Sequence, residues 1–179
     1  IAFASYMWSG RPLTLEKMLI LAINNKELHP FYQPIVKGNP AKPVGCEVLV
    51  RWLHNGSIIP PNQFIPLAEQ TGLIIQVTRQ LIRDVTDHFA IYYNPKHQFY
   101  ISFNLSARHL QSDMLEADLN YFLSRVDDKI GLVLELTERE IIAGDEKVKR
   151  NIARLKARGV RFALDDFGTG YATLETLQY

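Results

Sequence analysis

The sequence has a single cysteine, Cys46, among its 179 residues. One cysteine cannot form a disulfide within the chain, so a disulfide framework is excluded, and a reducing compartment is compatible with this count. Cys46 stands in a β-rich run, where we interpret it as a small buried residue without a chemical role.

Long apolar runs and an excess of one charge sign are also lacking. No run reaches the roughly 20 apolar residues that a membrane-spanning helix needs, and the formal net charge of +1 argues against a DNA-binding surface that works by bulk electrostatics. The apolar start, residues 1–8, is too short for a span and lacks the charged start of a signal peptide. For residues 1–14 two interpretations stay open, a linker that packs on the domain or the end of a transmembrane helix; residues 15–179 form the domain.

What the chain does have is the composition of a globular protein and an alternation of two patterns. Hydrophobic residues make up 47% and charged residues 22% of the sequence, which is typical of one soluble domain. Short β-rich runs alternate with longer segments of helical period, and this predicts an α/β fold with a mainly parallel sheet. The predicted strands are residues 31–36, 45–52, 100–105, 132–136 and 160–167.

Two architectures fit this alternation, an open doubly wound sheet and an eight-stranded barrel. No Gly-x-Gly-x-x-Gly follows the first predicted strand, which disfavours the dinucleotide-binding version of the open sheet.

Polar side chains recur at equivalent places of the predicted strands. Asn104, Glu135 and Asp165 follow one another at intervals of about 30 residues, the length of one strand–helix unit in a barrel of about 250 residues. Asp166 follows directly, and Glu47 lies in an earlier strand. The carboxyl ends of barrel strands meet at one mouth, so we expect these side chains to converge there.

Alternation along the second strand separates two faces. Glu47, Leu49 and Arg51 share one face, whereas the neighbouring residues Cys46 and Val48 share the other. The apolar face is expected to meet the helices, which leaves the charged face looking into the barrel. A Glu and an Arg that point inward need a bound partner, because burying unpaired charge is unfavourable.

Converging carboxylates repel one another unless a cation lies between them. The predicted ligands are all oxygen atoms, which favours Mg²⁺, Mn²⁺ or Ca²⁺ and disfavours zinc. The Asp165–Asp166 pair can bridge two ions, a recurring device for phosphoester hydrolysis. The alternative for each residue alone is a structural role, as a helix cap or the partner of a lysine.

Ordered sequence blocks resemble the EAL domain family. Glu47 to Trp52 resembles the signature Glu-Ala-Leu-x-Arg-Trp that gives the family its name. The other similar blocks, in family order, are Phe31-Tyr32-Gln33-Pro34-Ile35-Val36, residues 61–74, Asn104-Leu105-Ser106, Glu135-Leu136-Thr137-Glu138 and Asp165-Asp166-Phe167-Gly168-Thr169-Gly170-Tyr171.

This resemblance implies a TIM-like (β/α)₈ barrel whose first strand is antiparallel, with about the first five strands present in this chain. It implies a metal-dependent phosphodiesterase that hydrolyses cyclic di-GMP to linear pGpG, requires Mg²⁺ or Mn²⁺ in a two-metal site, and is inhibited by Ca²⁺. The implied metal ligands are Glu47, Asn104, Glu135, Asp165 and Asp166, of which Glu47, Asp165 and Asp166 would also be catalytic.

Further roles follow from the same resemblance. Gln33, Leu49 and Arg51 would bind the substrate, and the planar Arg51 fork suits a phosphate. Glu138 would anchor the loop after the aspartate pair by accepting its backbone N–H groups. That loop and the helix after it would form a homodimer contact.

The sequence departs from the family pattern at a few places. Val48 replaces the signature alanine on the helix-facing side, and Ala172-Thr173 replace two serines of the loop. A Lys, a Glu and a Gln that the family carries further along would fall after Tyr179, so we expect little activity from these 179 residues alone. An alternative is a catalytically silent domain that acts as a cyclic di-GMP receptor or a protein-interaction module.

The remaining expectations concern the surroundings. We expect a cytoplasmic protein, at the cytoplasmic side of the inner membrane if an N-terminal membrane or sensory domain precedes this chain. The basic residues between positions 147 and 158 are interpreted as a solvated helix face, and no DNA partner is predicted.

Overall fold

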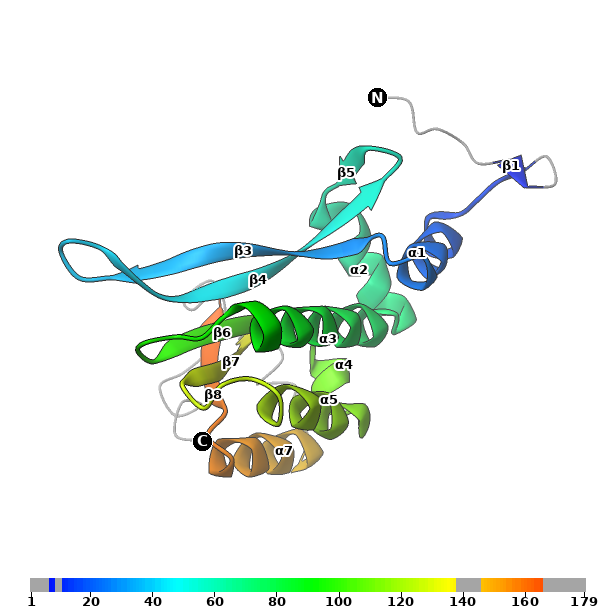
Figure 1. The fold of residues 1–179 in the computed structure, drawn as a ribbon. Helices are drawn as coiled ribbons and strands as arrows, with labels where there is room; N and C mark the ends of the chain where they lie inside the picture. Colours follow the sequence, from blue (N-terminus) through cyan, green and yellow to red (C-terminus); the bar gives the residue numbers. More distant parts are fainter. Residues whose placement is uncertain (1–6, 9–10, 138–145, 166–179) are drawn as a thin grey trace.

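The computed structural model describes residues 7–8, 11–137 and 146–165, and its ribbon shows strands alternating with helices (Figure 1). The N-terminal elements are β1 (Met7–Trp8), β2 (Arg11–Pro12), α1 (Leu15–Asn24), β3 (Leu28–Lys37), β4 (Lys42–His54) and β5 (Ser57–Ile59). There follow α2 (Pro61–Thr71), α3 (Ile74–Tyr92), β6 (Phe99–Asn104), α4 (Ala107–Leu110), α5 (Met114–Leu123), β7 (Ile130–Thr137), α7 (Glu146–Ala157) and β8 (Arg161–Asp165). The predicted α/β alternation is confirmed. No helix among the described residues is long and apolar enough to cross a membrane.

The main sheet has the order β3-β4-β6-β7-β8, and β5 pairs with β4 off this path. β3 is antiparallel to β4, whereas β4, β6, β7 and β8 run parallel to one another. The antiparallel first strand that the resemblance implies is therefore present. Pro34, which cannot donate to a ladder, lies on β3 at the sheet edge, where such a residue is tolerated.

Local sequence signals set the ends of several helices. Thr14 caps α1, because its hydroxyl oxygen accepts a hydrogen bond from the backbone N–H of Lys17 at 3.3 Å. Gly72 ends α2 and Gly159 follows α7, with φ angles of 82° and 84° that a residue with a side chain rarely adopts. Pro61 occupies the first turn of α2, where its missing N–H needs no partner.

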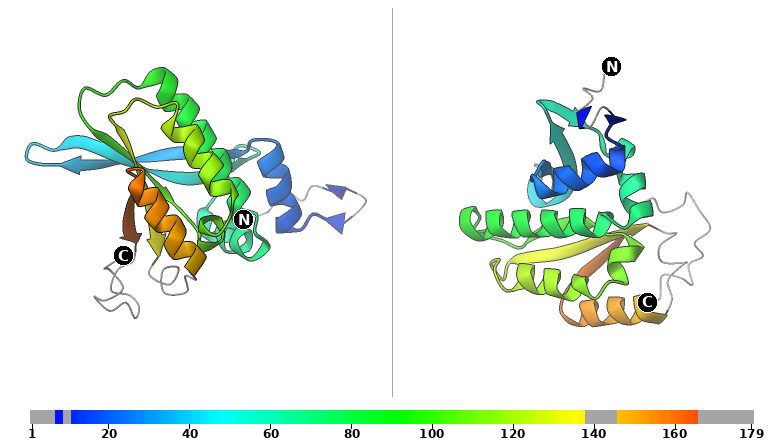
Figure 2. Two further views of the ribbon diagram at one scale, coloured as in Figure 1. Left: turned by 90° about the horizontal axis from the view of Figure 1, so that it is seen from below. Right: turned by 90° about the vertical axis from the view of Figure 1, so that its right-hand side faces the viewer.

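The hydrophobic core lies between the sheet and the helices α3, α5 and α7, which run side by side over one sheet face (Figure 2). Ile101 and Phe103 of β6 and Leu134 of β7 are at most 1% exposed and point to the helices. Cys46 and Val48 are buried on the same face, as the alternation along β4 predicts. Burial raises the pKa of the Cys46 thiol to about 11, so it stays protonated and inert.

Tyr100 of β6 lies on the opposite face of the sheet, where its ring packs among neighbouring strands. An added Cβ at Gly45 would lie 2.5 Å from the Tyr100 carbonyl oxygen, and one at Gly131 would lie 2.7 Å from its ring. Gly131 thus makes room for the ring, and Gly45 lets its strand approach the Tyr100 backbone. The Arg161 guanidinium stacks over the ring at 4.4 Å. This packing stands at the amino-terminal part of the strands and leaves their carboxyl ends to the polar residues.

Candidate functional site

Three predicted site residues lie at or near the carboxyl ends of parallel strands: Asn104 on β6, Glu135 on β7 and Asp165 on β8. The register pairs Glu47 with Ser102, and Asn104 with Glu135. In β-sheets, residues paired across parallel strands share a face, so these four side chains stand on the face away from the helices. The prediction that Glu47, Asn104 and Glu135 meet at one sheet end is therefore consistent with the register.

Glu47 and Asn104 are in direct contact. The Asn104 side-chain amide Nδ2 donates a hydrogen bond to Glu47 Oε1 at 2.8 Å, at a solvent-exposed position. The amide nitrogen is used in this bond, which leaves the Asn104 carbonyl oxygen as a further acceptor. The pair thus presents carboxylate and amide oxygens side by side.

Glu135 is held from the neighbouring strand by a residue that the sequence blocks do not include. The hydroxyl of Ser102 donates a hydrogen bond to Glu135 Oε1. Ser102 is 1% exposed, so the donor end of this contact is buried. The sequence signal for Ser102 is its place two residues before Asn104, which puts both on the same face of β6.

Arg51 and Leu49 continue the same face of β4 and line a cavity of about 250 Å³ together with Asn104 and Glu135. Arg51 donates through Nη1 to the backbone carbonyl of Val50 at 2.8 Å, and its guanidinium lies 5.9 Å from the centre of the Phe31 ring. The rest of the lining comes from β4 and β6, from α2, from α3 and from the segment after β6: Val48, Val50, Phe103, Pro61, Ile65, Glu69, Ile74, Val77, Thr78, Leu81, Leu105 and Ser106.

Gln33 lies on β3 at the position paired with Glu47. It is exposed and is not among the residues that line this cavity. Its position beside Glu47 on the sheet edge keeps it next to the polar residues, although β3 adds no wall to the cavity itself.

The remaining predicted residues are described in part or not at all. Asp165 ends β8, and its backbone pairs with Thr137, two positions beyond the pair Ala163–Glu135. Asp166 and Glu138 lie outside the described residues. Within the part of the chain that the structure describes, no group of three or more His, Cys, Asp or Glu side chains is close enough to hold a metal ion.

The predicted metal ligands among the described residues nevertheless suit a hard cation. Two carboxylates and one amide supply oxygen atoms, and no sulfur or imidazole stands among them. Mg²⁺ and Mn²⁺ prefer such ligands, whereas zinc prefers nitrogen and sulfur. The Asn104–Glu47 hydrogen bond brings two of these donor groups together before any ion is bound.

The chain is similar in sequence to known proteins of one family. The family model of the EAL domain matches residues 16–179. The cyclic di-GMP phosphodiesterase PdeL of Escherichia coli K12 is 44% identical over 164 residues, which are 88% of this chain and 44% of that protein. The probable cyclic di-GMP phosphodiesterase PdeG of the same organism is 41% identical over 179 residues, covering 98% of this chain and 35% of that protein.

The chain is also similar in fold to solved structures. A solved structure of the PaMucR phosphodiesterase in complex with c-di-GMP has a TM-score of 0.80 and 32% identity, and the match covers 92% of this chain and 68% of that one. The chain spans less than half the length of PdeL and PdeG.

Proposed function

We propose that this chain, which belongs to the EAL domain family, contributes the metal-binding strands of a phosphodiesterase that hydrolyses cyclic di-GMP to linear pGpG. The observation that carries the proposal is the meeting of Glu47, Asn104 and Glu135 on one sheet face, with Glu47 and Asn104 joined at 2.8 Å. The names of the relatives PdeL and PdeG support the substrate class.

In this proposal Glu47, Asn104, Glu135 and Asp165 hold a first Mg²⁺ or Mn²⁺ ion, and Asp165 and Asp166 reach a second. Bound ions of this kind lower the pKa of a coordinated water and offset charge on a phosphate oxygen. The role of the protein is to fix the carboxylates, which Ser102 does for Glu135 and Asn104 does for Glu47.

The proposed substrate contacts are drawn from the residues near the cavity. Arg51 lines it with Asn104 and Glu135, and in this proposal its planar guanidinium binds a phosphate oxygen of the substrate. Leu49 supplies an apolar wall, and Gln33 lies along the nucleotide from the sheet edge. Glu138 would anchor the loop that carries Asp166.

Three parts of the proposal concern the whole protein and rest only on its family membership. They are a homodimer built on the loop after Asp166 and the helix that follows, an N-terminal sensory or membrane domain, and a cytoplasmic site of action. The dimer residues lie outside the described part of the chain.

The proposal is tested by incubating the full-length protein with cyclic di-GMP and following linear pGpG by chromatography. We expect product with Mg²⁺ or Mn²⁺, no product after chelation with EDTA, and inhibition by Ca²⁺, because each step depends on ions held by oxygen ligands. Binding of cyclic di-GMP in equilibrium dialysis without product in the presence of Mg²⁺ would instead establish a receptor and contradict the proposal.

Ser102→Ala should raise the Mg²⁺ concentration for half-maximal hydrolysis about tenfold, since the outer partners of metal ligands typically contribute this much to affinity. Without the hydroxyl, the Glu135 carboxylate loses a donor from the neighbouring strand. The substitution removes one oxygen atom from a buried position and should leave the fold intact. Ser124→Ala, which removes a hydroxyl from an exposed position far from the sheet end, is the matched control; an equal Mg²⁺ requirement in both variants would rule out this role for Ser102.

A further inference from the structure

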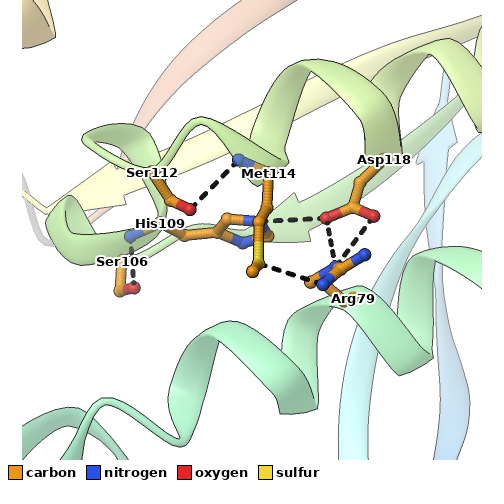
Figure 3. A network of polar contacts seen from close by, with 6 residues as sticks. All are labelled: Arg79, Ser106, His109, Ser112, Met114 and Asp118. Atoms are coloured by element: carbon orange, nitrogen blue, oxygen red, sulfur yellow. Dashed lines mark hydrogen bonds and ion pairs between the residues drawn. The ribbon is translucent and has the colours of Figure 1, made fainter.

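A buried polar network outside the proposed metal site joins three helices (Figure 3). Arg79 of α3 donates through Nε to Asp118 Oδ1 at 3.1 Å and lies 3.0 Å from Oδ2. His109 of α4 lies with Nε2 3.2 Å from Asp118 Oδ2. The side chains of Asp118 and His109 are fully buried, whereas that of Arg79 is 29% exposed.

The hydrogen bonds define the charge state of this network. Asp118 can only accept when it is ionised, so the His109 Nε2 must carry the proton that it donates. The other ring nitrogen, Nδ1, has no hydrogen-bond partner among the described residues. Burial lowers the pKa of His109, although the nearby Asp118 acts to raise it, and this favours the neutral ring beside the Arg79–Asp118 ion pair.

A buried ion-pair network of this kind is not expected to contribute much to the free energy of unfolding. Buried ion pairs often contribute no more to stability than apolar residues of similar volume, and their best-attested use is to specify one arrangement. The arrangement specified here is that of α4, a helix of four residues whose single turn would be marginal without external contacts. His109 is the side chain through which α4 reaches Asp118 on α5.

α4 is in turn connected to the proposed ligand Asn104. Asn104 ends β6, and Ser106, two residues later, caps α4 by accepting the backbone N–H of His109 at 3.3 Å. Between them, the Leu105 N–H donates to the Glu135 carbonyl oxygen at 2.9 Å. A shift of α4 would therefore be transmitted through two residues to the Asn104 amide and to the backbone of Glu135.

Arg79, the third member of the network, lies on α3, which forms another wall of the same cavity. Thr78, next to Arg79 on α3, lines the cavity with Leu105 and Ser106. Tying Arg79 to Asp118 thus also fixes the helix that forms the opposite wall. The network therefore joins this wall to α4, which follows the segment after β6.

We propose that His109 is a positioning residue: through Asp118 and Arg79 it fixes α4 and holds the Asn104 amide where a divalent ion can bind it together with Glu47. The inference rests on the proposed function in one respect, the assignment of Asn104 and Glu47 to the ion. It adds that ion affinity depends on a histidine that touches neither the ion nor the substrate.

The test is direct binding of Mn²⁺, followed by electron paramagnetic resonance of the free ion, in the full-length protein. His109→Leu keeps the volume but removes the donor, and we expect the dissociation constant for Mn²⁺ to rise about tenfold. His109→Gln can place an amide N–H near Asp118, and we expect a constant within about twofold of the wild type, since the donor is restored. If His109→Leu does not fold, His109→Asn carries the test, because its shorter amide ends before Asp118; at least a threefold rise is expected.

Loss of stability alone is controlled by Leu19→Ala, which removes a fully buried side chain from α1, away from the network. This control should melt at a lower temperature and bind Mn²⁺ as the wild type does. Equal Mn²⁺ affinity in the wild type and the donor-free variant, or no Mn²⁺ binding by the wild type, would overturn the proposal. A wild type that binds Mn²⁺ more tightly than the variant but cleaves no cyclic di-GMP would uphold the positioning role and reject only the proposed hydrolysis.

Discussion

Replacement of Glu47 by glutamine is expected to lower Mg²⁺-dependent hydrolysis of cyclic di-GMP by about a thousandfold, a loss of roughly 4 kcal/mol of transition-state stabilisation. The amide keeps the shape of the side chain and can still accept from Asn104. It cannot supply the negative charge that a divalent ion requires from its ligands. The rate constants of wild type and variant at saturating substrate and Mg²⁺ measure this loss.

A carboxylate that takes no part in the site serves as the control. Glu116 forms an exposed ion pair with Arg154 on the helix side of the sheet, and Glu116→Gln should hydrolyse cyclic di-GMP at the wild-type rate. Both variants should melt within a few degrees of the wild type, since neither charge lies in the core. Undiminished turnover by Glu47→Gln would remove Glu47 from the metal site and with it the main support for the proposed function.

The division of β4 into two faces could be predicted because a strand has a side-chain period of two. The apolar residues Cys46 and Val48 alternate with Glu47 and Leu49, and only one register buries the former. The meeting of Asn104 with Glu135 was predictable for a related reason, because equal spacing puts both at the ends of adjacent parallel strands. Both features could be predicted because each depends on a periodic sequence pattern, the alternation along a strand or the equal spacing of strand–helix units.

Short elements were not predicted, because they have too few residues to show a period. β5 has three residues, although Asn55-Gly56 before it is a strong hairpin signal and both adopt positive φ angles of 48° and 75°. α4 has four, and its one local sign is the cap at Ser106. Strand ends also differ by a few positions: the second predicted strand, residues 45–52, is described as Lys42–His54.

The buried network of Arg79, His109 and Asp118 could not have been found from the sequence. Its members lie on three helices, and nothing in their spacing distinguishes them from surface residues. Only the packing of α3, α4 and α5 over the sheet brings them together. Tertiary contacts of this kind have no period, so a pattern-based interpretation leaves such a histidine unassigned.

Trp52→Ala is expected to lower the free energy of unfolding by about 4 kcal/mol, within the range for a large aromatic side chain removed from a core. Trp52 is fully buried and packs edge-to-face on Phe64, with ring centres 5.5 Å apart. Its indole N–H donates to Glu27 Oε2 at 3.0 Å. Burial raises the pKa of Glu27, but the hydrogen bonds from His54 and Trp52 outweigh this and lower it, so the variant leaves an anionic carboxylate with one donor fewer.

Trp52→Phe separates the two contributions, because it keeps an aromatic ring against Phe64 and loses only the N–H and part of the volume. We expect it to cost about 1.5–3 kcal/mol, the usual range for a hydrogen bond to a charged group. Urea unfolding should be followed by far-UV circular dichroism, because Trp52 is one of only two tryptophans and its fluorescence disappears with the substitution. Equal stability of the alanine and phenylalanine variants would mean that ring packing on Phe64 contributes little, and that Trp52 stabilises the fold mainly through its hydrogen bond to Glu27, in the segment between α1 and β3.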